Sequence, residues 1–427
     1  MWNERLRSVE KSQTLLLNEQ SRNLETTGRE VFKFGFGQSP FPPLEAAIEA
    51  LRVHAGDKDY TSVQGLPELR ARVAEFHASV DQIDTNAERV LIAPGSKILI
   101  YAVMAAFEKA DVLMAAPAWV SYAPQARLLG HTPIKVDTTC EQRWRVLPEA
   151  IDRAVKSKAD PSVPSVLILN FPGNPDGQSY TDDELRELAQ AFRLHNILVI
   201  SDEIYGLLHH EGQHVSLARH YPEGSIVTSG LSKWCGAGGW RLGVALLPQS
   251  LEGAFKETLL GIASETYSCA TLPVQHAACQ AYQWNEGTRD YLAHQRRLLS
   301  SVGNWLANQL IEAKVAVHRP TGGFYLFPDF SPQAEKMRRA GIHTSQILCE
   351  RLLADTGVAL LPGDAFGMAP ERLCARLAYV EFDGRDALKA SREIGLERAL
   401  DANALQAIFP KTIRGTQRLT QWLAAFS

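Results

Sequence analysis

Short apolar runs alternate with helical patterns between residues 90 and 248 of the chain. Strands that are buried on both faces are almost continuously apolar, and this spacing is typical of βα units around a mainly parallel sheet. Ligands bind such sheets beyond the carboxyl ends of the strands, so polar residues that follow the runs are candidate site residues. The runs are Val90-Leu91-Ile92-Ala93, Val112-Leu113-Met114-Ala115, Val166-Leu167-Ile168-Leu169, Ile197-Leu198-Val199-Ile200, Ile226-Val227 and Val244-Ala245-Leu246-Leu247.

Helical patterns flank this central region. Residues 4–28 are polar with leucines at helical spacing, which predicts an N-terminal helix that ends at Gly28. Residues 66–77 form an amphipathic pattern, and a longer helical stretch extends from residue 274 to about residue 313. Two further strands are expected near residues 323–327 and 376–380.

The pattern predicts two domains in an α/β protein. We expect a large domain over residues 38–290, which holds the sheet, and a smaller α+β domain. The smaller domain would combine residues 1–37 with residues 291–427, because the long helical stretch carries the chain out of the sheet. A chain of 427 residues is too long for one small core and long enough for two or three domains.

Composition excludes several classes of protein. Hydrophobic residues make up 45% and charged residues 22% of the chain, and the net charge of −4 comes without the basic cluster that nucleic acid requires. The six cysteines form no C-x-x-C pair and are too sparse for a disulfide scaffold, so free thiols in a reducing compartment are expected. The N-terminus has no apolar signal-peptide core, and no run approaches the roughly 20 apolar residues of a membrane span. We therefore expect a cytoplasmic protein that binds neither nucleic acid nor membranes.

Polar side chains follow several of the apolar runs. Asn174 and Asp202 each close such a run, and Tyr205 lies three residues beyond Asp202. Lys233 comes after the run at residues 225–228, and Arg241 lies eight positions further on. An amide, a carboxylate, a phenol, a lysine and an arginine would then meet at one edge of the sheet. An enzyme needs this set to hold a pyridoxal phosphate and to run carbanion chemistry on it.

The motifs around these residues resemble those of a known family. They stand in the family's order: Asn170-Phe171-Pro172-Gly173-Asn174-Pro175, Ser201-Asp202-Glu203-Ile204-Tyr205, Gly230-Leu231-Ser232-Lys233 and Gly239-Trp240-Arg241-Leu242-Gly243. Over residues 31–379 the chain resembles the class I/II aminotransferases, which are fold-type I pyridoxal-phosphate enzymes. The resemblance implies an α/β fold with a mainly parallel, seven-stranded sheet in the large domain. It also implies pyridoxal 5'-phosphate (PLP) as the cofactor.

The resemblance further implies roles for the central residues. Lys233 would bond to the cofactor's aldehyde carbon and later move a proton between the substrate Cα and the cofactor. Asp202 would face the pyridine nitrogen and keep it protonated, while Tyr205 and Asn174 would bind the ring's O3′ oxygen. Taken singly, Asp202 could instead be a helix N-cap and Asn174 a turn residue.

Other positions would hold the phosphate, the ring and the substrate. Gly95, Ser96 and Lys97 open a helical run after the first strand, so their backbone amides could bind the phosphate. In the family a hydroxyl and a guanidinium complete that site, an aromatic stacks on the ring, and an arginine clamps the substrate's carboxylate. A tyrosine also reaches across the dimer interface, so a homodimer with composite active sites is expected. The matching residues are Ser232 and Arg241 for the phosphate, Trp119 for the ring, Arg376 with Gly37 and Asn174 for the substrate, and Tyr60 for the partner's site.

Alternatives remain open for some of these residues, and two patterns are rejected. Tyr60 could be an ordinary interface or core tyrosine, and Trp119 a core tryptophan. The stretch Gly236-Ala237-Gly238-Gly239 partly matches a dinucleotide-binding loop but does not directly follow a strand. His209, His210 and His214 could bind a metal, but no acidic or thiol ligand stands at a suitable spacing, so an exposed loop is expected. The sequence thus predicts no metal site.

The expected reaction is the ping-pong transfer of an amino group from an amino acid to a 2-oxo acid. A C–S lyase or a cyclopropane-forming synthase would use the same scaffold with a different pocket lining. A cofactor-binding regulatory module is disfavoured, because the roughly 30 residues before Phe34 are too few for a DNA-binding domain. Residues 265–269 offer no arginine for a second carboxylate, and Gln38-Ser39-Pro40-Phe41 replaces the family's usual Glu-Pro-Asp-Phe. Both features favour neutral or aromatic donors.

Overall fold

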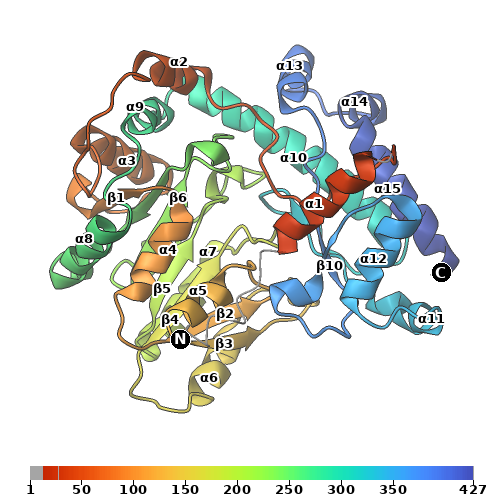
Figure 1. Cartoon of the computed structure of the whole chain (residues 1–427), viewed down its shortest axis with the longest axis horizontal. Coiled ribbons are helices and arrows are strands. Elements are labelled where there is room, and N and C mark those ends of the chain that lie inside the picture. Colours follow the sequence, from red (N-terminus) through yellow and green to blue (C-terminus); the bar gives the residue numbers. More distant parts are fainter. Residues whose placement is uncertain (1–12, 27, 427) are drawn as a thin grey trace.

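A mainly parallel sheet forms the centre of the larger part of the molecule (Figure 1). The computed structural model describes residues 13–26 and 28–426. The strand order is β1-β7-β6-β5-β4-β2-β3, and β7 alone runs antiparallel to both of its neighbours. The predicted α/β fold with a mainly parallel, seven-stranded sheet is therefore confirmed. The strands are β1 Val90–Ala93, β2 Asp111–Ala116, β3 Thr132–Asp137, β4 Ser165–Asn170, β5 Leu198–Asp202, β6 Ser225–Gly230 and β7 Gly243–Leu246.

One strand of this sheet, β3, has no counterpart among the apolar runs. It lies at the edge and pairs only with β2 among the described strands. Thr132, Lys135 and Asp137 on this strand are exposed, and Val136 is buried. Unlike β1, the buried strand at the opposite edge, β3 exposes polar residues, so it lacks the continuous apolar run by which the other strands are recognised.

Helices cover both faces of the sheet, because neighbouring residues of each central strand point to opposite sides. In β2, Val112 and Met114 pack with α4 (Ser96–Ala105), α5 (Tyr122–Leu128) and α8 (Ala254–Thr266). Leu113 packs on the other face with α6 (Pro148–Lys156) and α7 (Asp182–Leu194). Because helices cover both faces of the sheet, the carboxyl ends of β4, β5 and β6 are accessible only along the edge of the sheet.

Two predicted helices agree with the structure, as far as it describes them. The helix α1 (Gln13–Thr26) ends just before Gly28, and residues 4–12 of the predicted helix lie outside the described residues. The helix α3 (Pro67–Val80) corresponds to the amphipathic pattern, and buries Leu69, Val73 and Phe76 as the spacing of those residues indicates. The short helix α2 (Glu45–Val53) precedes it.

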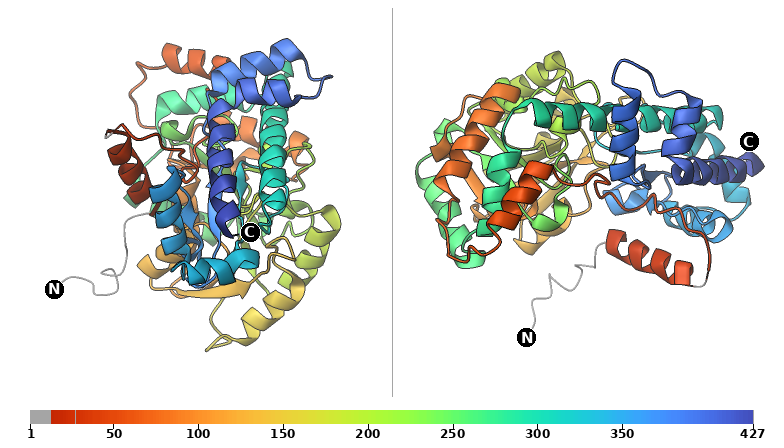
Figure 2. Two further views of the ribbon diagram at one scale, coloured as in Figure 1. Left: turned by 90° about the vertical axis from the view of Figure 1, so that its right-hand side faces the viewer. Right: turned by 90° about the horizontal axis from the view of Figure 1, so that it is seen from above.

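The long helical stretch is broken where the sequence pattern suggested continuity. The helix α9 (Leu272–Ala281) ends, and α10 (Glu286–Glu312) begins after a short turn. Asn285 caps α10, because its side-chain oxygen accepts a hydrogen bond from the Thr288 N–H at 3.0 Å. The helix α10 then runs from the neighbourhood of α9 and α2 to the second sheet, where it lies beside α15 (Figures 1 and 2).

A small antiparallel sheet forms the centre of the second part of the molecule. Its order is β8-β10-β9, and β8 and β10 lie in the regions predicted as strands. Phe32 forms a bridge with Val358, and the Phe34 carbonyl accepts a hydrogen bond from the Ala378 N–H, so the N-terminal segment joins this sheet. The exact division at residues 38 and 290 stays a prediction. The elements are β8 Tyr325–Leu326, β9 Leu361–Pro362, β10 Ala375–Ala378, α11 Ala334–Arg339, α12 Ser345–Thr356, α13 Gly384–Ile394, α14 Ala402–Ile408 and α15 Pro410–Leu423.

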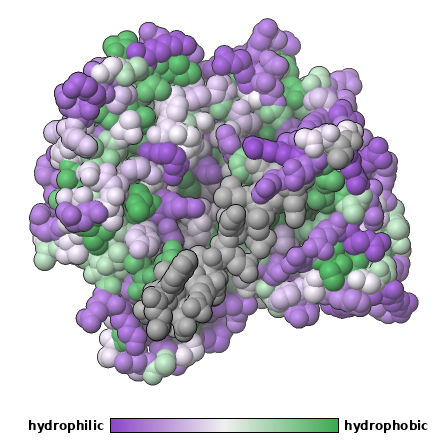
Figure 3. Space-filling model, viewed as in Figure 1, coloured by the Kyte–Doolittle hydropathy of each residue, from purple (hydrophilic) through white to green (hydrophobic). Residues whose placement is uncertain are grey.

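The surface shown in Figure 3 carries scattered hydrophobic residues among hydrophilic ones. None of the helices in the described part of the chain has the length and apolar character needed to cross a membrane. Among the large hydrophobic side chains, Tyr60 is exceptional, since 89% of it is exposed.

Candidate active site

A cavity of about 540 Å³ lies where the carboxyl ends of the central strands meet the second sheet. Its volume is in the range of small-molecule sites. It brings together most of the predicted site residues, while Gly95 lies just behind its wall and Tyr60 does not line it. The predicted residues in its lining are Gly37, Ser96, Lys97, Trp119, Asn174, Asp202, Tyr205, Ser232, Lys233, Arg241 and Arg376.

Asp202, the last residue of β5, places a buried carboxylate at the floor of the cavity. Its Oδ2 accepts a hydrogen bond from the Tyr122 hydroxyl at 2.6 Å, and its Oδ1 accepts one from Thr228 at 3.3 Å. Burial raises the pKa of Asp202 to about 6, although these hydrogen bonds and the nearby Lys233 ammonium act in the opposite direction. The carboxylate is thus held ready for a cationic partner.

An amide pair fixes the neighbouring wall of the cavity. Asn170, at the end of β4, donates from its side chain to the Asp202 carbonyl at 2.7 Å and accepts from the Asn174 N–H at 2.8 Å. The Asn174 side-chain oxygen accepts a hydrogen bond from Arg376 at 3.0 Å. The turn that contains Asn174 therefore aims its amide into the cavity, so its structural and its proposed functional role are compatible.

Arg376, on β10, is buried with no carboxylate partner among the described residues. Its Nη2 donates to the Gly35 carbonyl at 2.6 Å, its Nε has no hydrogen-bond partner, and the rings of Tyr325 and Phe366 lie 4.8 and 5.1 Å from its guanidinium carbon. Burial lowers the pKa of this guanidinium, yet arginine stays protonated in proteins. A buried cation with an unused donor is suited to an incoming carboxylate.

Lys233 reaches the cavity from the loop after β6. Its Nζ donates to the Gly37 carbonyl at 3.0 Å and lies 5.5 Å from the centre of the Tyr205 ring. Gly230 makes the turn out of β6 with a φ of +155°, and a Cβ there would come within 2.5 Å of the Leu242 carbonyl oxygen. The close approach of the β6 and β7 chains thus depends on glycine and directs Lys233 into the site.

The first turn of α4 forms a corner of the cavity whose groups are suited to an anion. Gly95 has a φ of +94° and provides no side-chain cap, so the first N–H groups of α4 are free to bind a ligand. A Cβ at Gly95 would lie 2.2 Å from Nη2 of Arg241. Arg241 is itself left-handed, with a φ of +56°, and donates to the Gly238 carbonyl at 2.9 Å. Backbone donors and a guanidinium therefore converge, together with the Ser232 side chain in the cavity lining.

Lys97 adds a further cation at this corner. Its Nζ lies 4.8 Å from the centre of the Trp119 ring. Burial lowers the pKa of Lys97, and the positive charges of Arg241 and Lys233 lower it further. No carboxylate of the described residues forms an ion pair with this ammonium.

Two tyrosines of the site were not predicted from the sequence. Tyr122 donates a hydrogen bond to Asp202. It lies three residues after Trp119, and this closeness to a predicted site residue was the only sequence feature that could have indicated it. Tyr325 comes from the second sheet, and its hydroxyl lies 2.9 Å from the Tyr205 hydroxyl. A Cβ at Gly37 would lie 2.0 Å from the Tyr325 oxygen, which explains the glycine. Only tertiary structure brings Tyr325 to the site.

The loop at residues 209–214 is exposed at residues 211–213, as expected, but the expectation that its histidines are exposed is wrong. His210 is half-buried, and its two ring nitrogens lie 3.0 and 3.1 Å from the carbonyls of Pro320 and Gly323. His214 has an acidic partner after all, since its Nε2 lies 2.8 Å from a carboxylate oxygen of Glu203. The burial and hydrogen bonds of these histidines indicate a structural role that connects the sheet to the segment around residue 322.

Comparisons with known proteins agree with this geometry. The family model "Aminotransferase class I and II" matches residues 29–381. The chain is 31% identical over 412 residues to an aspartate aminotransferase of Geobacillus stearothermophilus, which covers 94% of this chain and 99% of that relative. It is 30% identical to an aspartate/prephenate aminotransferase of Cereibacter sphaeroides, over 88% of this chain and 94% of that relative.

Solved structures show the same architecture. The structure of aspartate aminotransferase from Thermus thermophilus with maleate superposes with a TM-score of 0.79 and 27% identity, and covers 91% of this chain and 98% of that chain. The aromatic aminotransferase from Pyrococcus horikoshii OT3 gives a TM-score of 0.77 at 25% identity, over 95% of this chain and 98% of that chain. These relatives give no support to a lyase, a cyclopropane-forming synthase or a regulatory module. The chain is a transaminase and belongs to the class I and II aminotransferase family.

Proposed function

We propose that this aminotransferase binds PLP in the 540 Å³ cavity and uses it to move amino groups from acidic amino acids to 2-oxo acids. The observation that carries this proposal is the charge pattern of the cavity lining. Four cations, Lys97, Lys233, Arg241 and Arg376, surround a single carboxylate, Asp202, among the described residues. Such a site needs a ligand with several negative charges and one positive group.

The cavity fits PLP at each of its polar ends. The N–H groups at the start of α4, the Ser232 side chain and the Arg241 guanidinium would hold the phosphate. Asp202 would pair with the pyridine nitrogen, Trp119 would stack on the ring, and Asn174 and Tyr205 would bind its phenolic oxygen. When bound, the cofactor supplies the electron sink that stabilises negative charge at the substrate Cα.

The chain's own residues would then position the substrate and move its proton. Arg376, with Asn174 and the backbone at Gly37, would bind the α-carboxylate in bidentate fashion. Lys233 Nζ, which lies within 3.0 Å of the Gly37 carbonyl, would take the proton from the substrate Cα. Burial raises the pKa of Tyr205 well above its usual value, so its hydroxyl stays protonated and can donate a hydrogen bond.

The Lys97 ammonium supports a donor with a second carboxylate. The lack of an arginine at residues 265–269 favoured neutral or aromatic donors, but Lys97 provides an unpaired cation inside the same cavity. Relatives named as aspartate aminotransferases point in the same direction. We therefore favour aspartate or glutamate as the donor, and neutral amino acids as the alternative.

Tyr60 supports a homodimer with composite sites. Its side chain is 89% exposed and outside the cavity of its own chain, so it is available to a second subunit. We infer that it contacts the phosphate in the partner's site. We also place the enzyme in the cytoplasm, because all six cysteines are free, as in a reducing compartment.

The first prediction concerns Lys233. Reduction of the PLP-loaded enzyme with borohydride should fix the cofactor to Lys233, as peptide mass spectrometry would show. Lys233→Ala should lose this label and lower kcat by at least about 10³-fold, since the proton acceptor is gone. Lys97→Met serves as the control and should keep the label on Lys233. A label that maps to Lys97 would refute the assignment.

The second prediction concerns the hydrogen bond between Tyr122 and Asp202. Because this bond lowers the pKa of Asp202, Tyr122→Phe should raise that pKa. Asp202 would then be protonated over more of the acid range, so the acid limb of kcat/KM should move to higher pH. Thr228→Val, which removes a longer hydrogen bond of 3.3 Å, should give a smaller movement. An unchanged acid limb in Tyr122→Phe would show that Asp202 does not set it.

The third prediction concerns the donor. Lys97→Met should lower kcat/KM for aspartate or glutamate about 10- to 100-fold, which corresponds to a hydrogen bond between charged groups, and leave alanine or phenylalanine nearly unaffected. The backbone N–H of Lys97 remains, so the affinity for PLP should change little. Equal losses for acidic and neutral donors would contradict a role of Lys97 in donor choice.

The fourth prediction tests the composite site. Mixed dimers of Tyr60→Phe and Lys233→Ala subunits place both lesions in one site and leave the other native. Their activity should reach about half of the wild-type value, which exceeds the average of the two mutant homodimers by half of the activity that Tyr60→Phe alone removes. Wild-type subunits mixed with Lys233→Ala subunits give the reference value. Activity equal to the average, or a monomer in sedimentation at assay concentration, would exclude the composite site.

A further inference from the structure

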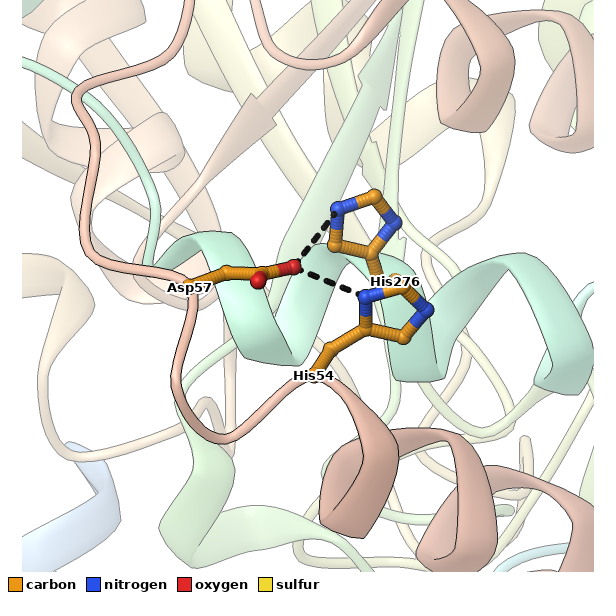
Figure 4. A group of neighbouring side chains, drawn as sticks. All are labelled: His54, Asp57 and His276. Carbon is orange, nitrogen blue, oxygen red and sulfur yellow. Dashed lines mark hydrogen bonds and ion pairs between the residues drawn. The ribbon is translucent and has the colours of Figure 1, made fainter.

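A compact group of potential metal ligands lies outside the cavity, on the segment that leads to Tyr60. His54 is the C-cap residue of α2, Asp57 lies in the turn that follows, and His276 projects from α9 (Figure 4). One ligand atom from each of the three lies within 4.8 Å of the others. Among the described residues, this is the only group of three or more histidine, cysteine, aspartate and glutamate ligands with this property.

Both imidazoles point toward one carboxylate oxygen. The Nδ1 atom of His54 lies 2.8 Å from Oδ2 of Asp57, and the Nε2 atom of His276 lies 3.6 Å from the same oxygen. The two imidazole rings are stacked, with centroids 4.0 Å apart and planes inclined by 16°. The stacking places Nδ1 of His54 beside Nε2 of His276, so both nitrogens could bind one ion next to Asp57.

The local charges favour a cation at that point. The ion pairs of Asp57 among the described residues involve only these two imidazoles. Neighbouring basic side chains are paired elsewhere: Lys58 lies 3.6 Å from Asp59, and Arg52 lies 3.0 Å from Glu49. A metal ion at that point would be attracted to the negative charge of Asp57 and to the ring nitrogens of both histidines.

The backbone holds the three ligands in place before any ion arrives. The Asp57 N–H donates to the His54 carbonyl at 3.0 Å, and the His54 N–H donates to the Ala50 carbonyl at 3.0 Å. His276 lies on a helix whose neighbouring residues Ala277 and Ala278 are fully buried. Two ligands on one turn and a third on a packed helix therefore need little ordering to bind an ion.

We propose that His54, Asp57 and His276 form a binding site for a divalent transition-metal ion of the Zn²⁺ class. Two imidazoles and one carboxylate are ligands of Zn²⁺, Co²⁺ and Ni²⁺, while Mg²⁺ and Ca²⁺ require oxygen ligands. The three side chains are 36%, 42% and 25% exposed, so water can complete the coordination. The ion would join the end of α2 to α9 and hold the loop that continues to Tyr60.

Calorimetric titration of the tag-free, PLP-loaded enzyme with Zn²⁺ tests this site. We expect one ion per chain, a rise in Tm of a few degrees in excess Zn²⁺, and slower amide hydrogen exchange at residues 54–60. His54→Ala, His276→Ala and Asp57→Asn should each weaken Zn²⁺ binding by at least about tenfold, since loss of even an outer-shell partner costs 10- to 100-fold. Asn has nearly the same shape as Asp, and residue 57 lies on an exposed turn, so Asp57→Asn should fold. This variant therefore still tests the site if a histidine variant fails to fold.

The matched control is His343→Ala, which removes an exposed histidine far from this group in the sequence and should leave Zn²⁺ binding unchanged. Absence of Zn²⁺ binding would mean that the group is only a hydrogen-bonded cluster. Binding that survives all three substitutions would place the ion elsewhere, and equally tight binding of Mg²⁺ would exclude the transition-metal class. Each of these outcomes overturns the proposal without bearing on the PLP site.

Discussion

The buried carboxylate of Asp202 is the group around which the rest of the site is arranged. Its pKa of about 6 lies about two units above the usual value, so burial of the ionised form costs the folded protein roughly 3 kcal/mol at neutral pH. This cost is present above the raised pKa and falls away as pH drops through it. Tyr122 and Thr228 limit the cost through hydrogen bonds, and a cationic ligand at the floor of the cavity would remove more of it. A fold that retains such a group is poised to bind that ligand.

The second half of the site depends on contact between the two sheets. Arg376 and Tyr325 belong to the small sheet, whereas Asn174 and Tyr205 follow strands of the large one. The hydrogen bonds from Arg376 to Asn174 and between the two tyrosine hydroxyls cross this boundary. The proposed carboxylate clamp and the proposed cofactor floor therefore belong to different parts of the fold, so any relative movement of these parts would change the distance between them.

Sequence reasoning recovered the features that have a local signature. Fully buried strands give apolar runs. Asp202 ends one of these strands, and Asn174 and Lys233 come a few residues after two others, so the strands and these polar residues could be recognised in the sequence. The strand β3 was not predicted, because its exposed residues are polar and interrupt the apolar pattern.

Contacts that arise only from the packing of distant segments could not be recognised in the sequence. Tyr325, whose role depends on docking of the small sheet, was missed for this reason. The histidine loop was misjudged because Glu203 and the carbonyls near residue 322 lie close to it only in the folded state. His54 and Asp57 are more than 200 residues from His276, so their grouping could not be seen either.

The excess of positive charge in the cavity links assembly of the site to ligand binding. Burial lowers the pKa of Lys97, and the positive charges of Arg241 and Lys233 lower it further. Without anions these cations repel one another, because the single carboxylate of Asp202 cannot neutralise them all and the N-terminus of α4 adds a partial positive charge. A phosphate at α4 and carboxylates near Arg376 and Lys97 would relieve that repulsion at separate points. Affinity for cofactor and substrate would then arise largely from relief of an electrostatic cost that the empty cavity carries, which is the physical meaning of a preorganised site.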